Sequence, residues 1–199
     1  LLIRFVLLQI ATALQQMKTL KIVGLDPSFR HLGIAVGTMD CDTGILTVNH
    51  INTVHTVPNP NKKVPNSTWD ISQAKLLYTA IQEYTLDADV VCIEVPYGSQ
   101  DVKAAVGRGI CLGLLSTIQC PNIFLVTPQS VKKVLGNPKA TKKDSVAWAS
   151  TTHPEAPWHK HRGRITTDAN EHSADAIAAI YAAASQHNFK ALKENSYAN

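Results

Sequence analysis

Residues 18–39, KTLKIVGLDPSFRHLGIAVGTM, hold two apolar runs separated by the turn 27–30. Apolar runs of this length that are bounded by turn residues predict buried strands. The first run, 18–26, stops at the carboxylate Asp26 and a proline, and the second, 32–39, follows directly. A third strand is expected between Gly44 and Val57. The start of the chain therefore predicts an antiparallel meander.

The pattern changes after a loop rich in Pro and Asn at 58–66. Apolar residues recur at helical spacing over 67–84, and the continuous apolar run 90–95, VVCIEV, predicts a central strand. Further helices are expected at 102–118, 127–136, 142–150 and 168–187, with a strand at 122–126 and a loop at 153–164. This order predicts an α/β fold with a mixed sheet, antiparallel in its first half and built by crossovers in its second.

The chain has 199 residues and a mass of 21.6 kDa, the size of one domain. Its hydrophobic share of 45% and charged share of 17% argue against disorder. We expect a single domain over 17–199, with residues 1–16 as an extension of uncertain origin that is too short and too interrupted to span a bilayer. Four cysteines without paired spacing suggest buried thiols in a reducing compartment.

Positive charge is concentrated between Pro128 and Arg164. This stretch has eight Lys and Arg against two acidic residues, a net charge of +6, whereas the whole chain has +4. A concentrated basic region is typical of a phosphate-backbone partner, and a merely solubilising face is the alternative.

Carboxylates stand where buried strands end. Asp26 closes the first strand and Glu94 lies near the end of the central one, and adjacent strands would place them side by side. His172 and Asp175 are three residues apart in an Ala-rich helix, so they share one face. Oxygen-rich sites of this kind suit Mg²⁺ or Mn²⁺, and two such ions can support phosphoryl displacement.

Each of these residues also has an ordinary explanation. Asp26 could accept turn N–H groups, Glu94 could be an edge residue, and His172 could be a surface histidine. Asp168 shares the face of His172 by spacing, but with Glu171 it fits an N-capping pair at the helix start. The joint arrangement favours a metal site.

Five segments, in this order, resemble the RuvC family of Holliday-junction resolvases in the RNase H-like superfamily. They are IVGLDPSFRHLGIAVG (22–37), CIEVPYGSQ (92–100), GRG (107–109), TPQSVKKVLG with ATKKDSV (127–146) and HSADAIAAIYAA (172–183). The similarity covers about residues 20–187. Segments 44–66 and 146–168 depart from the family pattern.

The resemblance implies a five-stranded mixed sheet flanked by helices, a homodimer, and Mg²⁺-dependent paired nicking of four-way DNA junctions in recombination and repair. It assigns the acidic tetrad to Asp26, Glu94, His172 and Asp175, as catalytic residues and ligands of two Mg²⁺ ions. It also suggests Tyr97 as the aromatic wedge. Together with the basic stretch, the candidate DNA contacts are Tyr97, Arg108, Lys132, Lys133, Lys142, Lys143, Lys160, Arg162 and Arg164.

Two alternatives stay open: a YqgF-like nuclease of the same superfamily and a non-catalytic protein that binds branched DNA. The short chain argues against a two-lobed sugar-kinase-like ATPase. The expected location is the cytoplasm, on the nucleoid or in a virus-infected cell, with an organelle also open. No membrane partner is expected.

Overall fold

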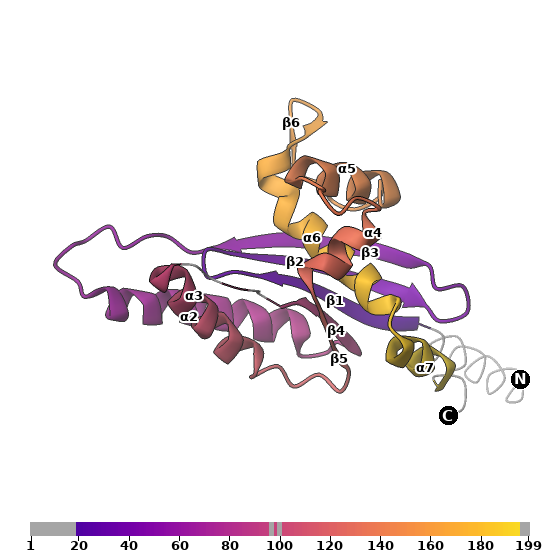
Figure 1. The fold of residues 1–199 in the computed structure, drawn as a ribbon, viewed down its shortest axis with the longest axis horizontal. Helices are drawn as coiled ribbons and strands as arrows, with labels where there is room; N and C mark the ends of the chain where they lie inside the picture. The colour runs from indigo at the N-terminus through magenta and orange to yellow at the C-terminus, as the bar shows by residue number, and fades with distance from the viewer. Residues whose placement is uncertain (1–18, 96–97, 99–100, 196–199) are drawn as a thin grey trace, which may run out of the picture.

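The computed structural model describes residues 19–95, 98 and 101–195 (Figure 1). Its main sheet has five strands in the order β3-β2-β1-β4-β5. They are β1 (Thr19–Pro27), β2 (His31–Asp40), β3 (Leu46–His55), β4 (Val90–Glu94) and β5 (Ile123–Val126). β1, β2 and β3 pair antiparallel, while β4 is parallel to both β1 and β5. The predicted α/β fold, with an antiparallel first half, is confirmed.

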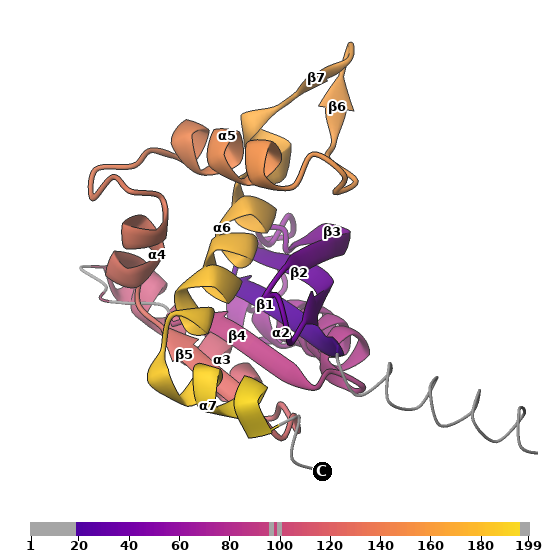
Figure 2. The ribbon, with the colours of Figure 1, turned by 90° about the vertical axis from the view of Figure 1, so that its right-hand side faces the viewer.

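Helices cover both faces of this sheet (Figure 2). One face carries α2 (Asn66–Thr85) and α3 (Val102–Leu115). The other carries α4 (Pro128–Val134), α5 (Lys142–Thr152), α6 (Thr167–Ala184) and α7 (His187–Asn195). Among the described residues, no helix has the length and hydropathy needed to cross a membrane.

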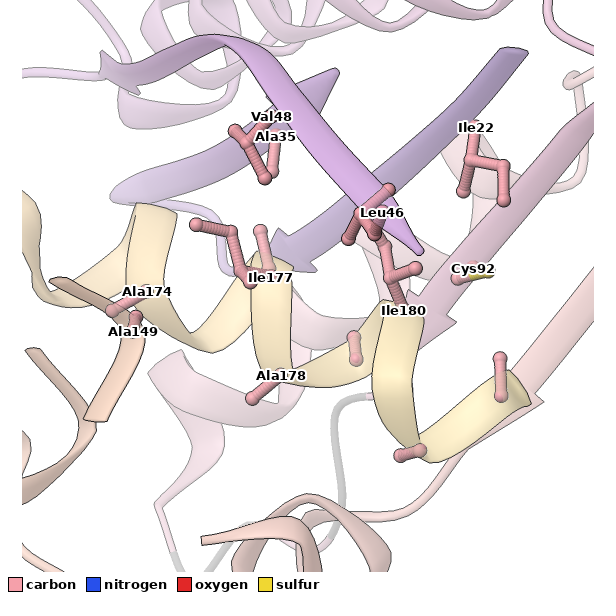
Figure 3. Close-up of a cluster of buried hydrophobic side chains, with 14 of the residues drawn as sticks. Ile22, Ala35, Leu46, Val48, Cys92, Ala149, Ala174, Ile177, Ala178 and Ile180 are labelled. Atoms are coloured by element: carbon pink, nitrogen blue, oxygen red, sulfur yellow. The ribbon is translucent and has the colours of Figure 1, made fainter. Parts of the chain in front are cut away.

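Alternation along the strands divides the core in two. Ile22 packs on the α6 side, whereas its neighbours Val23 and Leu25 pack against α2 and α3, and all three are fully buried. Figure 3 shows Ile177 and Ile180 of α6 facing the strands. Because side chains alternate with a period of two, even-numbered positions of β1 face α6. Asp26 is one of these positions.

Two glycines let α6 lie directly on the sheet. A Cβ added to Gly24 would lie 2.1 Å from the carbonyl oxygen of Ala176, and one added to Gly33 would lie 2.1 Å from that of His172. Real side chains do not tolerate such approaches, so both positions exclude any residue with a Cβ at this spacing. The contact at Gly33 fixes His172 above the start of β2.

Several boundaries differ from the sequence expectation. The last helix ends at Ala184, and α7 follows as a separate helix. The expected loop at 153–164 contains strand β6 (Lys160–His161), which pairs with β7 (Arg164–Ile165) in a small hairpin. Strands of two residues have no alternation for a sequence pattern to detect.

The expected capping pair at the start of α6 is wrong. The N-cap is Thr166, without a side-chain capping bond, and Asp168 is exposed in the first turn. Glu171 is 8% exposed and turns toward Lys142 instead. An ion pair with another helix thus takes the carboxylate away from the helix end.

The cysteines match the expectation of unpaired thiols. All four are free; Cys41, Cys92 and Cys111 are buried, and Cys120 is partly buried. Burial raises the pKa of the Cys111 thiol to about 11.

Candidate active site

Asp26 and Glu94 lie next to each other at the carboxyl ends of β1 and β4. These strands are parallel, and their register pairs Gly24 with Cys92 and Leu25 with Ile93. One step further along each strand places Asp26 beside Glu94, on the face that α6 covers. Adjacent parallel strands therefore bring together two carboxylates that are far apart in sequence.

α6 brings His172 and Asp175 to the same point. The Nδ1 of His172 donates a hydrogen bond to Oδ2 of Asp26 at 2.8 Å. Both side chains are about four-fifths buried, with exposed fractions of 18% and 21%. Asp175 accepts a hydrogen bond on Oδ1 from Ser145 Oγ of α5 at 2.5 Å. The structure thus gathers the four predicted residues from three elements at one end of the sheet.

The carboxylates of the cluster affect one another's ionisation. Burial and the nearby charges of Asp26 and Asp175 raise the pKa of Glu94 to about 8. Burial and Asp26 likewise raise the pKa of Asp175 to about 6, against the opposing hydrogen bond from Ser145. Like charges at this range resist joint ionisation. The cluster therefore carries a surplus of negative charge that a cation would relieve.

His172 is held between two carboxylates. Burial disfavours its charged form, but the hydrogen bond to Asp26 and the charges of Asp26, Glu171 and Asp175 outweigh burial and raise its pKa. Its Nε2 lies 3.3 Å from Oε1 of Glu171. Both ring nitrogens thus face carboxylate oxygens, an arrangement that favours the imidazolium.

Sequence reasoning missed two further histidines beside this cluster. His31, at the start of β2, stacks on His172 with ring centroids 4.7 Å apart and an interplanar angle of 11°. The Nδ1 atoms of His31 and His55 lie 2.9 Å apart, at hydrogen-bonding distance. Burial and the neighbouring His172 lower the pKa of His31. They meet because the register of β2 and β3 pairs His31 with His55, and no sequence pattern gives that register.

Glu171 was also missed as part of the site. Its Oε1 accepts a hydrogen bond from Nζ of Lys142 at 2.7 Å, and this contact raises the pKa of Lys142. Lys142 itself is 70% exposed on its side chain. A lysine held at the edge of the cluster is placed to meet an incoming anion.

A cleft of about 570 Å³ opens beside the carboxylates. Asp26 and Glu94 line it together with Phe29 and Arg108. Lys132 of α4 is near enough to Glu94 to oppose the rise in its pKa. Two carboxylates thus line the cleft together with Arg108 of α3, and Lys132 of α4 lies near one of them.

The other predicted DNA contacts are exposed side chains on neighbouring elements or lie outside the described residues. Lys133 and Lys143 are exposed on α4 and α5. Lys160, Arg162 and Arg164 are exposed on the β6–β7 hairpin. Tyr97 and residues 1–16 lie outside the described residues.

The oxygen donors of Asp26, Glu94 and Asp175 are of the type that binds Mg²⁺ or Mn²⁺. Within the described part of the chain, no three His, Cys, Asp or Glu side chains already form a metal-binding group. One oxygen each of Asp26 and Asp175 is engaged by His172 and Ser145. The donor chemistry fits these metals, and binding would require side chains to turn.

Comparison with known proteins gives similarity in structure alone. No family model matches the sequence, and no curated protein matches it. RuvC of T. thermophilus in complex with a Holliday junction substrate superposes with a TM-score of 0.59 at 20% identity, covering 88% of this chain and 96% of that one. A second Thermus thermophilus RuvC structure gives 0.54 at 19% identity, covering 81% and 95%.

A Fowlpox virus resolvase in complex with Holliday junction DNA gives a TM-score of 0.48 at 13% identity, covering 81% of this chain and 96% of that one. The two RuvC matches span most of both chains. The chain therefore has the RuvC fold, as its sequence motifs led us to expect.

Proposed function

We propose that this chain is a Mg²⁺-dependent endonuclease that cuts four-way DNA junctions. The observation that carries the proposal is the gathering of Asp26, Glu94 and Asp175 at one end of the sheet, where Asp26 and Glu94 also line a cleft together with Arg108. The shared fold with RuvC, one structure of which holds a Holliday junction substrate, supports the choice of substrate.

Asp26, Glu94 and Asp175 would hold the metal ions, with His172 beside them. The chemistry that bound Mg²⁺ supplies is activation of a water and stabilisation of charge on the leaving oxygen. The protein's own task is to keep these carboxylates ionised and together although they are largely buried. The raised pKa values of Glu94 and Asp175 indicate that ionising these carboxylates is unfavourable without a cation.

The remaining site residues position the reacting groups. Asp26 fixes the ring of His172 through Nδ1, and Glu171 holds Lys142 at the rim. Lys132, Lys142 and Arg108 offer cationic groups to the phosphates on either side of the scissile bond. In-line attack of water on the scissile phosphorus, with the 3′ oxygen as the leaving group, would give 5′-phosphate and 3′-hydroxyl ends.

Paired symmetrical nicks require two active sites. The described residues of one chain supply one acidic cluster, so we propose a homodimer on the junction. The net +6 charge of residues 128–164 provides the electrostatic attraction to the DNA backbone.

The test is cleavage of a synthetic four-way junction with Mg²⁺, compared with a linear duplex of the same sequence. Glu94→Gln should lower junction cleavage by about 100-fold or more, the range found when a group that stabilises developing charge is removed. Glu83→Gln changes an exposed glutamate of α2 and is the matched control; this variant should cleave the junction as the wild type does. Unimpaired cutting by the Glu94 variant, or equal cutting of both substrates, would refute the proposal. Junction binding without any cleavage would favour a non-catalytic binding protein.

A further inference from the structure

Residues 160–165 form a hairpin with a tightly specified turn. Lys160 pairs with Ile165 and His161 with Arg164, which leaves Arg162 and Gly163 as the two turn residues. Both have positive φ, 49° for Arg162 and 78° for Gly163. Two-residue turns of this kind match the twist of the flanking strands and set their register. The hairpin is therefore a shaped element, although the sequence pattern predicts a loop.

The hairpin is basic and uncompensated. Lys160, His161, Arg162 and Arg164 are all exposed, and residues 156–167 contain no Asp or Glu. Among the described residues, none of Lys160, Arg162 and Arg164 forms an ion pair. Like charges held together in this way repel one another unless an anion outside the protein binds them.

The base of the hairpin is fixed to the helix that carries the active site. Asn170, 1% exposed, donates from Nδ2 to the carbonyl oxygens of His159 at 2.9 Å and Thr166 at 2.7 Å. Its Oδ1 accepts from the backbone N–H of His159 at 2.9 Å. Asn170 precedes Glu171 and His172 on α6. One buried amide therefore ties both ends of the hairpin to the segment that holds the site.

Figure 2 shows the hairpin standing out from the body of the protein, beyond α5 and the first turns of α6. A face that served only solubility would gain nothing from this projection or from a buried clamp. A two-stranded ribbon is of a size that the major groove of DNA admits, and its Lys and Arg can neutralise the flanking phosphates.

We propose that the β6–β7 hairpin enters the groove of one duplex arm of the DNA bound at the active site, and so selects branched DNA over a single duplex. This inference rests on the proposed function, since it takes the occupant of the acidic cleft to be DNA. In this arrangement the site holds the strand to be cut while the hairpin engages an arm displaced from it. A linear duplex would not reach both at once.

Two variants separate shape from charge. Lys160→Ala/Arg162→Ala/Arg164→Ala removes the charges. Gly163→Val keeps every charge but places a β-branched residue at a left-handed φ. A Cβ at Gly163 meets no atom within 4 Å, so the strain stays in the turn. The control for charge is Lys62→Ala/Lys63→Ala/Lys75→Ala, at exposed lysines in the 58–66 loop and on α2. The control for backbone strain is Gly44→Val, at a positive-φ glycine at the opposite end of the sheet, where a Cβ meets only the flexible end of Lys193.

The measurements are hydroxyl-radical footprinting of a four-way junction and the salt dependence of binding without divalent ions. We expect the wild type and controls to protect a stretch of one arm, and both hairpin variants to lose that protection. In the charge variant, the slope of log affinity against log salt concentration should also become less steep by about 2–3. This estimate takes roughly 0.9 for each phosphate that the hairpin no longer neutralises. The preference for a junction over a duplex should fall in both variants.

An unchanged footprint in both variants would overturn the inference, as would loss in the charge variant alone, which would leave charge and not shape as the cause. Failure of the proposed function looks different: the wild type itself would not cut the junction. A wild type that cuts, with hairpin variants that cut and bind as well as the controls, would leave the nuclease standing and remove only the role of the hairpin.

Discussion

Glu94 shows that the candidate site costs free energy of folding and so does not serve to stabilise the structure. A carboxylate at the end of a buried strand loses solvation, and here it also faces Asp26 and Asp175. Both effects raise its pKa to about 8, far above the ordinary value of 4.5. At neutral pH, folding therefore either protonates this group or confines a repelled charge. A function that needs the negative charge accounts for its presence.

Glu94→Gln should accordingly stabilise the protein in the absence of divalent ions. With a folded pKa above the unfolded one, the wild type loses stability as pH rises from about 4.5 to about 8. The gain from the substitution should thus be large at pH 8 and small at pH 4.5. Each kcal/mol corresponds to about 2–4 °C in a domain of this size. Thermal melts of the variant and of Glu83→Gln at the two pH values provide the measurement, and a gain that is equal at both would contradict the pKa argument.

Lys142→Ala should destabilise the fold although the lysine is exposed. Its partner Glu171 is 11% exposed on its side chain, so truncation leaves a largely buried carboxylate with the more distant His172 Nε2, at 3.3 Å, as its remaining partner. Because Lys142 is 70% exposed, solvent screens the pair, and we expect a loss of about 1 kcal/mol, below that of a fully buried pair. Urea unfolding checks this against Lys143→Ala, the exposed neighbour on α5, which should change little. Equal losses in the two variants would argue against the ion pair.

At this scale the sequence predicts part of the candidate site. Asp26 and Glu94 could be placed together because strand pairing and side-chain alternation are periodic. His172 and Asp175 could be placed together because residues three apart lie on the same face of a helix. His31, His55 and Glu171 could not. Their positions depend on the register between β2 and β3 and on how α5 meets α6, which no periodic pattern encodes.

The central element is α6, whose small residues let it lie close to β1 and β2. Gly33→Ala should be severely disruptive, because the new Cβ would lie 2.1 Å from the carbonyl oxygen of His172 and would force α6 away. Backbone on both sides leaves little room to relax, and we expect a loss of about 3 kcal/mol or more, in the range of overpacked cores. The displacement should also lower junction cleavage beyond the loss of folded protein.

Gly113→Ala is the matched control. Gly113 lies within α3, and a Cβ there meets nothing within 4 Å. Alanine favours helix over glycine by about 1 kcal/mol, so this variant should be as stable as the wild type or slightly more so. Chemical unfolding of both variants, with the cleavage rate per folded molecule, tests the pair. A mild effect at Gly33 would mean that α6 has more freedom than the structure shows.

Elements with a clear hydrophobic pattern along the sequence could be predicted, and very short elements could not. The continuous apolar character of 90–95 and the helical spacing of 67–84 are dictated by burial, and β4 and α2 lie there. The β6–β7 hairpin depends on two residues with positive φ and on Asn170 from another element. The start of α6 was misjudged because Glu171, which has the spacing of a capping residue, is used in an ion pair with Lys142.

At the scale of the whole molecule, the fold brings acidic and basic side chains to the same end of the sheet. The carboxyl ends of β1 and β4 carry the acidic cluster, and the basic residues of α4, α5 and the hairpin come from the single stretch 128–164. Two residues of this stretch, Lys132 and Lys142, lie at the acidic cluster itself, and the hairpin extends the positive charge outward from it. Excess salt should weaken DNA binding steeply for this reason.

Symmetrical cutting of a junction is a property of an assembly and not of one chain. The part of the chain that the structure describes has one acidic cluster, so two nicks within the lifetime of a single complex require two copies. We expect a particle of roughly 43 kDa on one junction, twice the 21.6 kDa of the chain. On a supercoiled plasmid that extrudes a cruciform, coordinated nicks should produce linear DNA directly, whereas independent nicks first relieve the supercoiling and the junction is reabsorbed. A single-chain complex by sedimentation, together with nicked circles as the main product, would refute the dimer while leaving the chemistry of the site intact.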